Sequence, residues 1–385
     1  MNKSSTVARF EPATLMLCFS HLRWDFVVQR PHHLMRRAAK SYHVVYWEEA
    51  VRHDGPESLV LRDDAFGVVV ATPHIPHGHP DERRAVRDLL DSFVARTLHD
   101  RLITWYYTPM ALGFSDHLVP DVCLYDCMDE LSAFKFAPDS LGWNEGRLFD
   151  RSAAIFTGGR SLYEAKRNRH AHVHCLPSSI DAAHFHKARS PMPDPADQAH
   201  IPTPRVGFFG VIDERMDLDL VRQTAQQAPD LQFVIIGPVT KIDPHHLPQA
   251  ANIHWLGSKR YEDLPAYLAN WQAGWMPFAL NDATRFISPT KTPEFLAAGL
   301  PLTSTAVPDV VADYAATGLV EIGDAASMAI ALRQSLRGRN ARWLAGVDEV
   351  LAQTSWDRTW AQMHACIEGV TAASTLRQDG DFANV

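Results

Sequence analysis

The sequence predicts an α/β protein built from two successive domains, each with a parallel sheet. Short apolar runs alternate with helical patterns along almost the whole chain. A proline-rich segment near the middle interrupts this alternation, which then restarts. The length of 385 residues is also more than one domain usually needs. Because strands separated by helices are typical of β-α-β units, we expect a parallel sheet on each side of the interruption.

The first half contains seven apolar runs with the length of strands and one clear helix. The strand candidates are residues 14–20, 42–46, 66–71, 102–106, 122–125, 153–157 and 173–176, and the helix candidate is 29–40. We assign residues 1–187 to an N-terminal domain. Residues 188–204, with the prolines of the segment, are interpreted as a linker.

The second half repeats the pattern. Strands are predicted at 205–210, 231–237, 252–257, 273–278, 302–305 and 319–322, and helices at 217–227, 264–271, 292–298 and 325–337. We assign residues 205–355 to a C-terminal domain and 356–372 to a final helix that crosses back to the N-terminal domain; the tail 373–385 has no pattern. Two sheets facing each other form a cleft at the carboxyl ends of their strands, where ligands bind.

Composition excludes several classes of protein. Apolar residues are 46% and charged residues 21%, as in globular proteins. A net charge of −8 argues against a dedicated nucleic-acid binder. No apolar run approaches the roughly 18 residues that span a bilayer. Five cysteines without C-x-x-C spacing indicate a reducing compartment, so we expect a cytoplasmic protein.

The first predicted helix carries four positive charges, at Arg30, Arg36, Arg37 and Lys40. Such a helix can dock on anionic lipid at the inner face of the membrane, or on a lipid-diphosphate acceptor. It can equally be an ordinary solvated face, and both interpretations stay open.

Several common enzyme motifs are absent from the sequence. It has no G-x-G-x-x-G, no G-x-x-x-x-G-K-[ST], no H-E-x-x-H and no G-x-S-x-G. Two groups of histidines, 74/77/79 and 170/172/174, are candidate metal ligands. The second group would extend over about 13 Å of strand, which is too long for one metal, and the first lies in a loop without paired carboxylates. We expect no metal site.

The strongest group of candidate site residues lies between Ser288 and Pro301. Ser288 and Thr290 precede a helix that Thr292 is expected to cap, and unpaired N–H groups at such an end suit a phosphate. Lys291 adds a cation beside that anion, and Glu294 can accept hydrogen bonds from ribose hydroxyls. The alternative is an ordinary capped helix.

Three glycines that follow strands support the same site. Gly210 ends one strand and allows close approach of a ligand to the backbone, and Arg215, shortly after it, can reach a diphosphate. Gly237 and Gly257 end the next two strands, where a base can lie against the backbone. The alternative for Arg215 is a solvated surface loop.

Taken in order, these elements resemble the C-terminal half of retaining glycosyltransferases of the two-domain GT-B type, family four, which includes sucrose-synthase-like and bacterial polysaccharide enzymes. The family pattern S-P-x-K-x-x-E-x-x-A-A-G-x-P occurs here as residues 288–301, S-P-T-K-T-P-E-F-L-A-A-G-L-P. Residues 20–34 and 124–131 also resemble a subgroup found with surface-polysaccharide synthesis. The resemblance covers roughly residues 14–370 and implies two Rossmann-like domains facing across a cleft.

The resemblance implies a metal-independent, hexosyltransferase-like enzyme that moves a sugar from a nucleotide diphosphate, most often UDP, to a hydroxyl of a glycan, lipid-linked or small-molecule acceptor. It implies no cofactor besides that co-substrate. Phe286 stands where the family often has a first glutamate, whose role Asp282 would then take. We assign catalytic roles to Asp126, Asp129, Arg215 and Lys291, donor binding to Gly210, Gly237, Gly257, Ser288, Thr290, Lys291 and Glu294, and acceptor binding to Arg23, Asp25 and Arg30.

Which of Asp126 and Asp129 acts stays open at this point, and Asp129 with Glu130 can instead simply begin a helix. Two other functions also stay open. One is a nucleotide-sugar epimerase of the same fold. The other is a catalytically silent scaffold that binds a nucleotide sugar.

Overall fold

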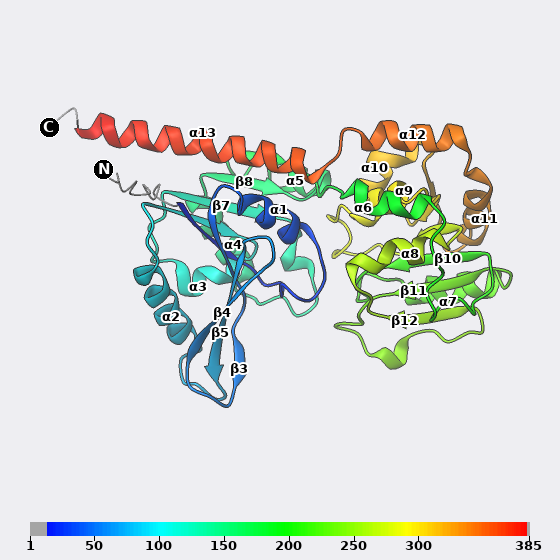
Figure 1. Ribbon diagram of the computed structural model, residues 1–385, viewed down its shortest axis with the longest axis horizontal. Coiled ribbons are helices and arrows are strands. Elements are labelled where there is room, and N and C mark those ends of the chain that lie inside the picture. Colours follow the sequence, from blue (N-terminus) through cyan, green and yellow to red (C-terminus); the bar gives the residue numbers. More distant parts are fainter. Residues whose placement is uncertain (1–13, 383–385) are drawn as a thin grey trace, which may run out of the picture.

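The computed structural model describes residues 14–382 and contains two parallel sheets, each flanked by helices (Figure 1). The first sheet has the strand order β3-β5-β2-β1-β6-β7-β8-β9, and only β4, which pairs with β5, runs antiparallel. Its strands are β1 (Thr14–Phe19), β2 (His43–Trp47), β3 (Val51–His53), β4 (Ser58–Asp63), β5 (Val69–Pro76), β6 (Arg101–Tyr106), β7 (Val122–Cys127), β8 (Ala154–Thr157) and β9 (Val173–Cys175).

The second sheet has the order β12-β11-β10-β13-β14-β15, and all its strands are parallel. These strands are β10 (Arg205–Phe209), β11 (Gln232–Ile236), β12 (Ile253–Gly257), β13 (Ala273–Met276), β14 (Leu302–Ser304) and β15 (Val320–Ile322). This is the doubly wound order: β11 and β12 are added on one side of β10, whereas β13, β14 and β15 are added on its other side. The switch point therefore lies between β10 and β13. The first sheet reverses in the same way between β1 and β6, and ligands bind at such switch points.

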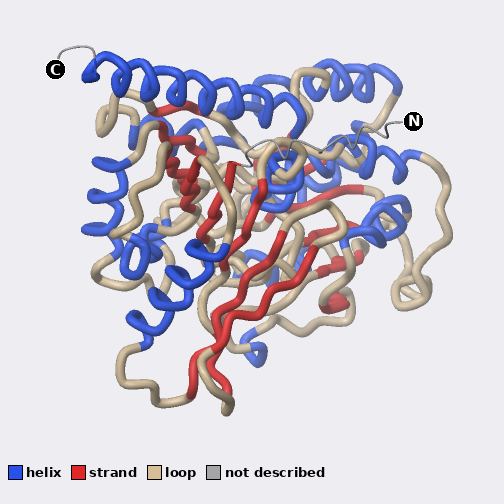
Figure 2. The backbone as a smooth tube through the Cα atoms, turned by 60° about the vertical axis from the view of Figure 1, so that its left-hand side comes forward, coloured by secondary structure: helices blue, strands red, loops and turns tan. Residues whose placement is uncertain are grey.

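Helices cover both sheets. Those of the first half are α1 (Arg30–Ala38), α2 (Glu82–Arg96), α3 (Leu112–Ser115), α4 (Leu141–Arg151), α5 (Arg160–Lys166) and α6 (Ala182–His186). Those of the second half are α7 (Leu218–Gln227), α8 (Leu264–Ala269), α9 (Lys291–Ala297), α10 (Pro308–Tyr314), α11 (Met328–Gly338), α12 (Ala341–Leu351) and α13 (Trp356–Phe382). Figure 2 shows these helices on the outside of the strands.

The apolar runs form strands because both faces of each sheet are covered. Along β1, Leu15, Leu17 and Phe19 pack into one buried cluster, whereas Met16 and Cys18 pack into the cluster on the opposite face. A central strand of this kind is apolar at every position rather than at alternate ones. The prediction of an α/β protein with two parallel-sheet domains is confirmed.

The final helix crosses back to the first domain, as expected. Figure 1 shows α13 lying along the first domain, and Trp356, Met363 and Ile367 are buried in one of that domain's core clusters. The described part of α13 continues to Phe382, beyond the predicted end at residue 372. Residues 383–385 of the predicted tail, and 1–13 of the predicted first domain, lie outside the described residues.

The segment interpreted as a linker packs against the second domain. Ile201 is buried in the core of that domain, and so are Ile180, Phe185 and Ala188 from the end of the predicted first domain. The buried Gln198 side chain accepts a hydrogen bond from Trp271 Nε1 at 2.9 Å. By packing, the second domain therefore begins after β9, because the apolar side chains before and within the proline-rich segment anchor it to this core.

Gly207 in the middle of β10 leaves room for Trp271, and we expect its replacement by alanine to destabilise the protein. A Cβ atom there would lie 2.0 Å from Trp271 Cε3, and this indole is 1% exposed. Forcing an extra group into a packed core costs roughly 2–3 kcal/mol. Urea denaturation should measure that loss. Gly142→Ala is the control, because a Cβ there has no described atom within 4 Å; a similar loss in both variants would contradict the explanation.

Candidate active site

A cavity of about 710 Å³ lies between the two domains. It opens at the carboxyl ends of strands from both sheets, where the two switch points face each other. The first domain contributes the loop after β1, the loop between β4 and β5, and Met128 and Asp129 after β7. The second domain contributes the ends of β10 and β11, the segment after β12, and the first turn of α9.

The start of α9 places Lys291 and Glu294 on the cavity, as predicted. Lys291 Nζ donates a hydrogen bond to Thr290 Oγ1 at 3.3 Å and lies 3.7 Å from Glu294 Oε2. Ser288 and Thr290 also line the cavity. The expectation that Thr292 caps this helix is wrong, because the helix begins at Lys291 and Thr292 is buried inside it.

Two of the three predicted glycines meet beside Lys291. Gly237 has φ +152°, and a Cβ there would lie 1.7 Å from the Gly210 carbonyl oxygen. A Cβ at Gly210 would lie 2.9 Å from Lys291 Cε. Both residues line the cavity, so their lack of side chains lets the lysine lie across the ends of β10 and β11. Gly257 ends β12 with φ +67° next to the lining residue Ser258.

Glu294 is a buried carboxyl group with a raised pKa. Burial raises its pKa to about 6, and the nearby Lys291 opposes this rise. Oε2 of Glu294 has no hydrogen-bond partner among the described residues. Glu294 lines the cavity and its Oε2 is ion-paired with Lys291, so the carboxylate keeps the capacity to accept a further hydrogen bond.

The raised pKa predicts how stability depends on pH. A carboxyl pKa raised from 4.5 to about 6 in the folded state corresponds to about 2 kcal/mol. Its stabilising contribution is present at low pH and is lost as the pH rises through 6. We therefore expect the difference in stability between Glu294→Gln and the wild type to shift by about 2 kcal/mol in favour of the variant when the pH is raised from 4 to 8. Denaturation at both pH values measures this shift. Glu262→Gln, at an exposed residue, is the control. The same pH dependence of stability in all three proteins would contradict the prediction.

Arg215 and Asp129 face each other across the domain boundary. The Arg215 guanidinium hydrogen-bonds Asp213 at 2.7–3.2 Å and lies 5.5 Å from the ring centre of Phe134 in the first domain. Burial raises the pKa of Asp129 to about 6, although Arg215 and Arg30 oppose the rise. Asp129 lines the cavity, so it combines access to a substrate with a pKa suited to proton transfer.

Asp126 is placed quite differently from Asp129. Its carboxylate is fully buried and accepts hydrogen bonds from Arg30 Nε and Nη2 at 2.8–3.0 Å. Arg30 Nη1 donates to the Leu176 carbonyl at 2.8 Å. The structure thus uses both residues to join α1 to β7 and β9, and does not present Asp126 as a free acid or Arg30 as a free cation.

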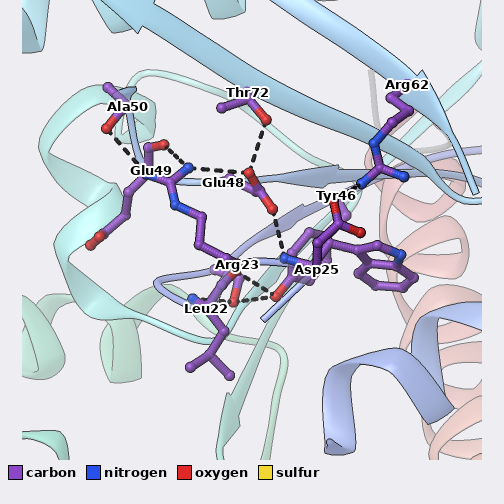
Figure 3. Close-up of polar contacts among 11 residues, drawn as sticks. Leu22, Arg23, Asp25, Tyr46, Glu48, Glu49, Ala50, Arg62 and Thr72 are labelled. Carbon is purple, nitrogen blue, oxygen red and sulfur yellow. Dashed lines mark hydrogen bonds and ion pairs between the residues drawn. The ribbon is translucent and has the colours of Figure 1, made fainter. Parts of the chain in front are cut away.

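The predicted acceptor residues Arg23 and Asp25 also differ in their position relative to the cavity. Arg23 donates to Glu48 Oε2 at 3.1 Å and to the Glu49 and Ala50 carbonyls (Figure 3), and it is not among the residues that line the cavity. Asp25 lines the cavity and pairs with Arg62 at 2.7 Å. The Arg23 network therefore fixes the loop after β1, and Asp25 is among the residues of this loop that line the cavity.

Phe286 and Asp282 lie apart from the cavity's lining. Phe286 packs against a core cluster of the first domain, so it contributes to the contact between domains. Asp282 is exposed and does not line the cavity in the described chain. The expectation that Asp282 replaces the family's first glutamate receives no support from this position.

Asp309 of α10 joins the two domains close to the site. Its carboxylate accepts hydrogen bonds from the backbone N–H groups of Arg160 and Ser161, both at 2.9 Å, at the start of α5. The preceding Gly159 lies against the donor-side loop, since a Cβ there would be 2.7 Å from Ser288 Cβ. Asp309 thus caps a helix of the other domain and keeps this turn in contact with Ser288.

Asp309→Ala should therefore destabilise the protein by about 1–2 kcal/mol, the usual cost of losing an N-cap. Asp313→Ala removes an ion pair with the largely exposed Arg160 side chain and should cost about 0–1 kcal/mol. Denaturant midpoints of the two variants compare these effects directly. Equal destabilisation by both would argue against the capping role.

The positive face predicted for the first helix is largely neutralised. Arg30 pairs with Asp126, Arg36 with Asp64 and Arg37 with Asp357. None of the helices between residues 14 and 382 has the length and apolar character needed to cross a bilayer. In that same part of the chain, no group of three His, Cys, Asp or Glu residues is arranged to hold a metal ion.

Two doubly wound domains with a cavity between their switch points define the GT-B architecture. Residues 203–337 match the family model described as Glycosyl transferases group 1. Over 243 residues the chain is 24% identical to the Bacillus subtilis (strain 168) protein named "Putative teichuronic acid biosynthesis glycosyltransferase TuaH". The match covers 59% of this chain and 61% of that relative's length.

Solved structures agree on the fold. Sucrose-phosphate synthase from Thermosynechococcus elongatus matches with a TM-score of 0.73 and 14% identity, over 94% of this chain and 100% of that one. An E. coli structure described as trehalose-6-phosphate bound with UDP-2-fluoro glucose matches with a TM-score of 0.70 and 12% identity, over 93% and 99%. The resemblance to GT-B glycosyltransferases, drawn from residues 288–301 and the order of the strands, is confirmed.

Sequence reasoning missed several residues of the cavity. Arg62 lies near the end of β4 and Asp64 directly follows that strand; the apolar run of β4 is only three residues long, Leu59–Leu61, and is largely exposed. Tyr261 follows β12 by four residues, beyond the glycine at the strand end. The one signal in the sequence that could have placed Tyr261 on the cleft is its short distance from the end of β12.

Proposed function

We propose that this protein is a glycosyltransferase that moves a sugar from a nucleoside diphosphate, UDP in the first instance, to a hydroxyl group of an acceptor. One observation carries the proposal: Lys291 and Glu294 from one domain and Asp129 from the other line the same cavity. The match to the group 1 family model, the name of the B. subtilis relative and the UDP-sugar of the E. coli structure support it. The relative's name also favours a role in surface-polysaccharide synthesis.

Lys291 and Arg215 have the charge that the leaving group requires. As the bond between the anomeric carbon and the diphosphate oxygen breaks, its electron pair goes to that oxygen. Cations fixed beside the diphosphate stabilise the transition state more than the ground state. Lys291 is the stronger candidate, because Arg215 is already paired with Asp213.

The second domain would hold the nucleoside. Glu294 would accept hydrogen bonds from the ribose through its carboxylate, which lines the cavity beside Lys291. Gly210 and Gly237 would let the diphosphate approach the backbone. Glu294→Ala should weaken nucleotide binding by about one to two decades, as expected for loss of a charged hydrogen-bond partner.

The first domain would hold the acceptor. Its hydroxyl oxygen bonds to the anomeric carbon, and its proton goes either to the departing diphosphate or to Asp129. Asp129 lines the cavity and its pKa of about 6 suits the second route. Asp25 is the predicted acceptor residue best placed to contact the acceptor.

The proposal includes no cofactor besides the sugar nucleotide and no metal. It places the reaction in the cytoplasm, with a glycan or lipid-linked acceptor. Peripheral membrane contact stays a prediction, and three ion pairs on α1 weaken its original basis. Flotation with liposomes, with and without anionic lipid, tests it.

Calorimetric titration with UDP, GDP, ADP and TDP tests the proposal, followed by incubation with UDP-sugars and analysis of the products. We expect UDP to bind selectively, and glycosyl transfer to release it when an acceptor is present. Conversion of the UDP-sugar to an isomer without acceptor would instead identify an epimerase. Absence of binding by all four nucleotides would contradict the proposal and favour a silent scaffold.

A further inference from the structure

A buried ion cluster in the first domain contacts the residue that follows Asp129 in the chain. Lys166 Nζ, at the end of α5, lies 2.6 Å from Glu130 Oε2 and donates to both carboxylate oxygens of Glu145 in α4 at 2.9 Å. These contacts use the three donor positions of an ammonium group. Lys166 is 4% exposed and does not line the cavity. The cluster therefore connects two helices of the first domain to the loop that carries Asp129.

The same cluster also contacts the backbone of that loop through the end of β7. Cys127 Sγ donates to the Asp129 carbonyl at 3.6 Å and lies 4.0 Å from Glu145 Oε1. The buried Tyr125 hydroxyl donates to the same Glu145 oxygen at 3.2 Å. Glu145 is thus bound both from β7 and by Lys166, so it joins the strand end to the ammonium group.

The position of the Asp129 carboxylate depends on the backbone of this loop. Among the described residues no side chain is hydrogen-bonded to that carboxylate, and the nearby guanidinium groups act on it as charges. Further along the loop, the Lys135 N–H group donates to Glu214 Oε1 of the second domain at 3.2 Å. The contact between Glu130 and Lys166 is therefore the link to the first domain that stands directly beside Asp129.

We propose that Lys166 is a positioning residue: through Glu130 it fixes the loop after β7 and so holds the Asp129 carboxylate at the cavity, where that carboxylate takes the acceptor's proton. This inference rests on the proposed function, because Lys166 affects turnover in this way only if Asp129 is the base. A misplacement of about 1 Å can cost roughly 100-fold in rate. We therefore expect Lys166→Met to lower kcat by about 10- to 100-fold. The affinity for UDP, which binds to the second domain, should stay unchanged.

A double-mutant cycle on the full chain tests the inference. Initial rates of UDP release, with the UDP-sugar and acceptor that the wild type uses, give kcat for the wild type, Lys166→Met, Asp129→Asn and the double variant. If Lys166 acts through Asp129, Lys166→Met should lower kcat in the wild type and have no further effect in Asp129→Asn. A purely structural role would produce the same fold-loss in both backgrounds. Circular dichroism and titration with UDP establish the folded fraction of each variant.

Two further variants complete the design. Lys166→Met leaves two buried carboxylates without their cation, so Glu130→Gln is the milder test of the same link and should also lower kcat. Arg169→Met is the matched control. Arg169 donates to Glu145 in the same cluster, but its described partners do not include Glu130, so its loss should leave kcat of the folded enzyme unchanged.

The outcomes separate this inference from the proposed function. Equal losses of kcat from Lys166→Met in the wild type and in Asp129→Asn would overturn the inference and leave the glycosyltransferase intact. Unchanged kcat in both Lys166→Met and Glu130→Gln would overturn it as well. Absence of turnover by the wild type with every UDP-sugar tested would instead overturn the proposed function, and this inference with it.

Discussion

Asp129→Asn is expected to lower kcat by about 10²- to 10⁴-fold, the range for loss of a general base. An amide cannot take the acceptor's proton, whereas the carboxylate of Asp129 lines the cavity and has a pKa near 6. In the wild type, kcat should therefore fall as the pH drops below 6, when Asp129 becomes protonated. The variant should lose this acidic limb. Initial rates of UDP release between pH 5 and 9 measure both effects.

Asp126→Asn is the informative comparison. It breaks the buried pair with Arg30 and should cost about 3–5 kcal/mol of stability, but the folded fraction should keep the acidic limb of kcat. An Asp129→Asn enzyme with normal turnover would remove Asp129 from the mechanism. Loss of the limb in Asp126→Asn alone would reverse the assignment of the two carboxylates.

Lys291→Ala should weaken UDP binding by roughly 100-fold, within the range for a charged hydrogen bond lost beside an anion. Lys291 is held in place by its hydrogen bond to Thr290 and by its packing against Gly210. Water in the space left by Lys291→Ala would therefore be a poor substitute for the ammonium group. Titration calorimetry measures the change in dissociation constant.

Lys291→Arg keeps the charge and should retain part of the affinity. Lys40→Ala, at an exposed position two residues after α1, should leave the affinity for UDP unchanged. Unaltered UDP affinity in Lys291→Ala would contradict the placement of the diphosphate at α9.

The fold could be predicted from the sequence because its strands are buried on both faces. Runs such as residues 14–20 and 231–237 are mostly apolar, without strict alternation, and helical patterns separate them, so the sequence predicts a parallel sheet. Strand β4 was missed for the converse reason. Most of its residues are exposed and pair with β5 at the sheet's margin, and its apolar run is only three residues long.

The candidate site was predictable where its residues are close together in sequence. Lys291 and Glu294 share one helical turn, and the motif around them is compact. Asp126 and Asp129 could not be distinguished, because the difference depends on Arg30, which is 96 residues away in the chain. Tyr261 and Asp309 likewise gain their meaning only from contacts that folding creates across the domains.

Hydrogen exchange measured by mass spectrometry, with and without UDP, tests the central claim most directly, because it locates the nucleotide on the full chain. We expect UDP to slow exchange in peptides that cover residues 258–264 and 288–297, with little change in the β4–β5 region. Binding of UDP with protection confined to other parts of the chain would contradict the account.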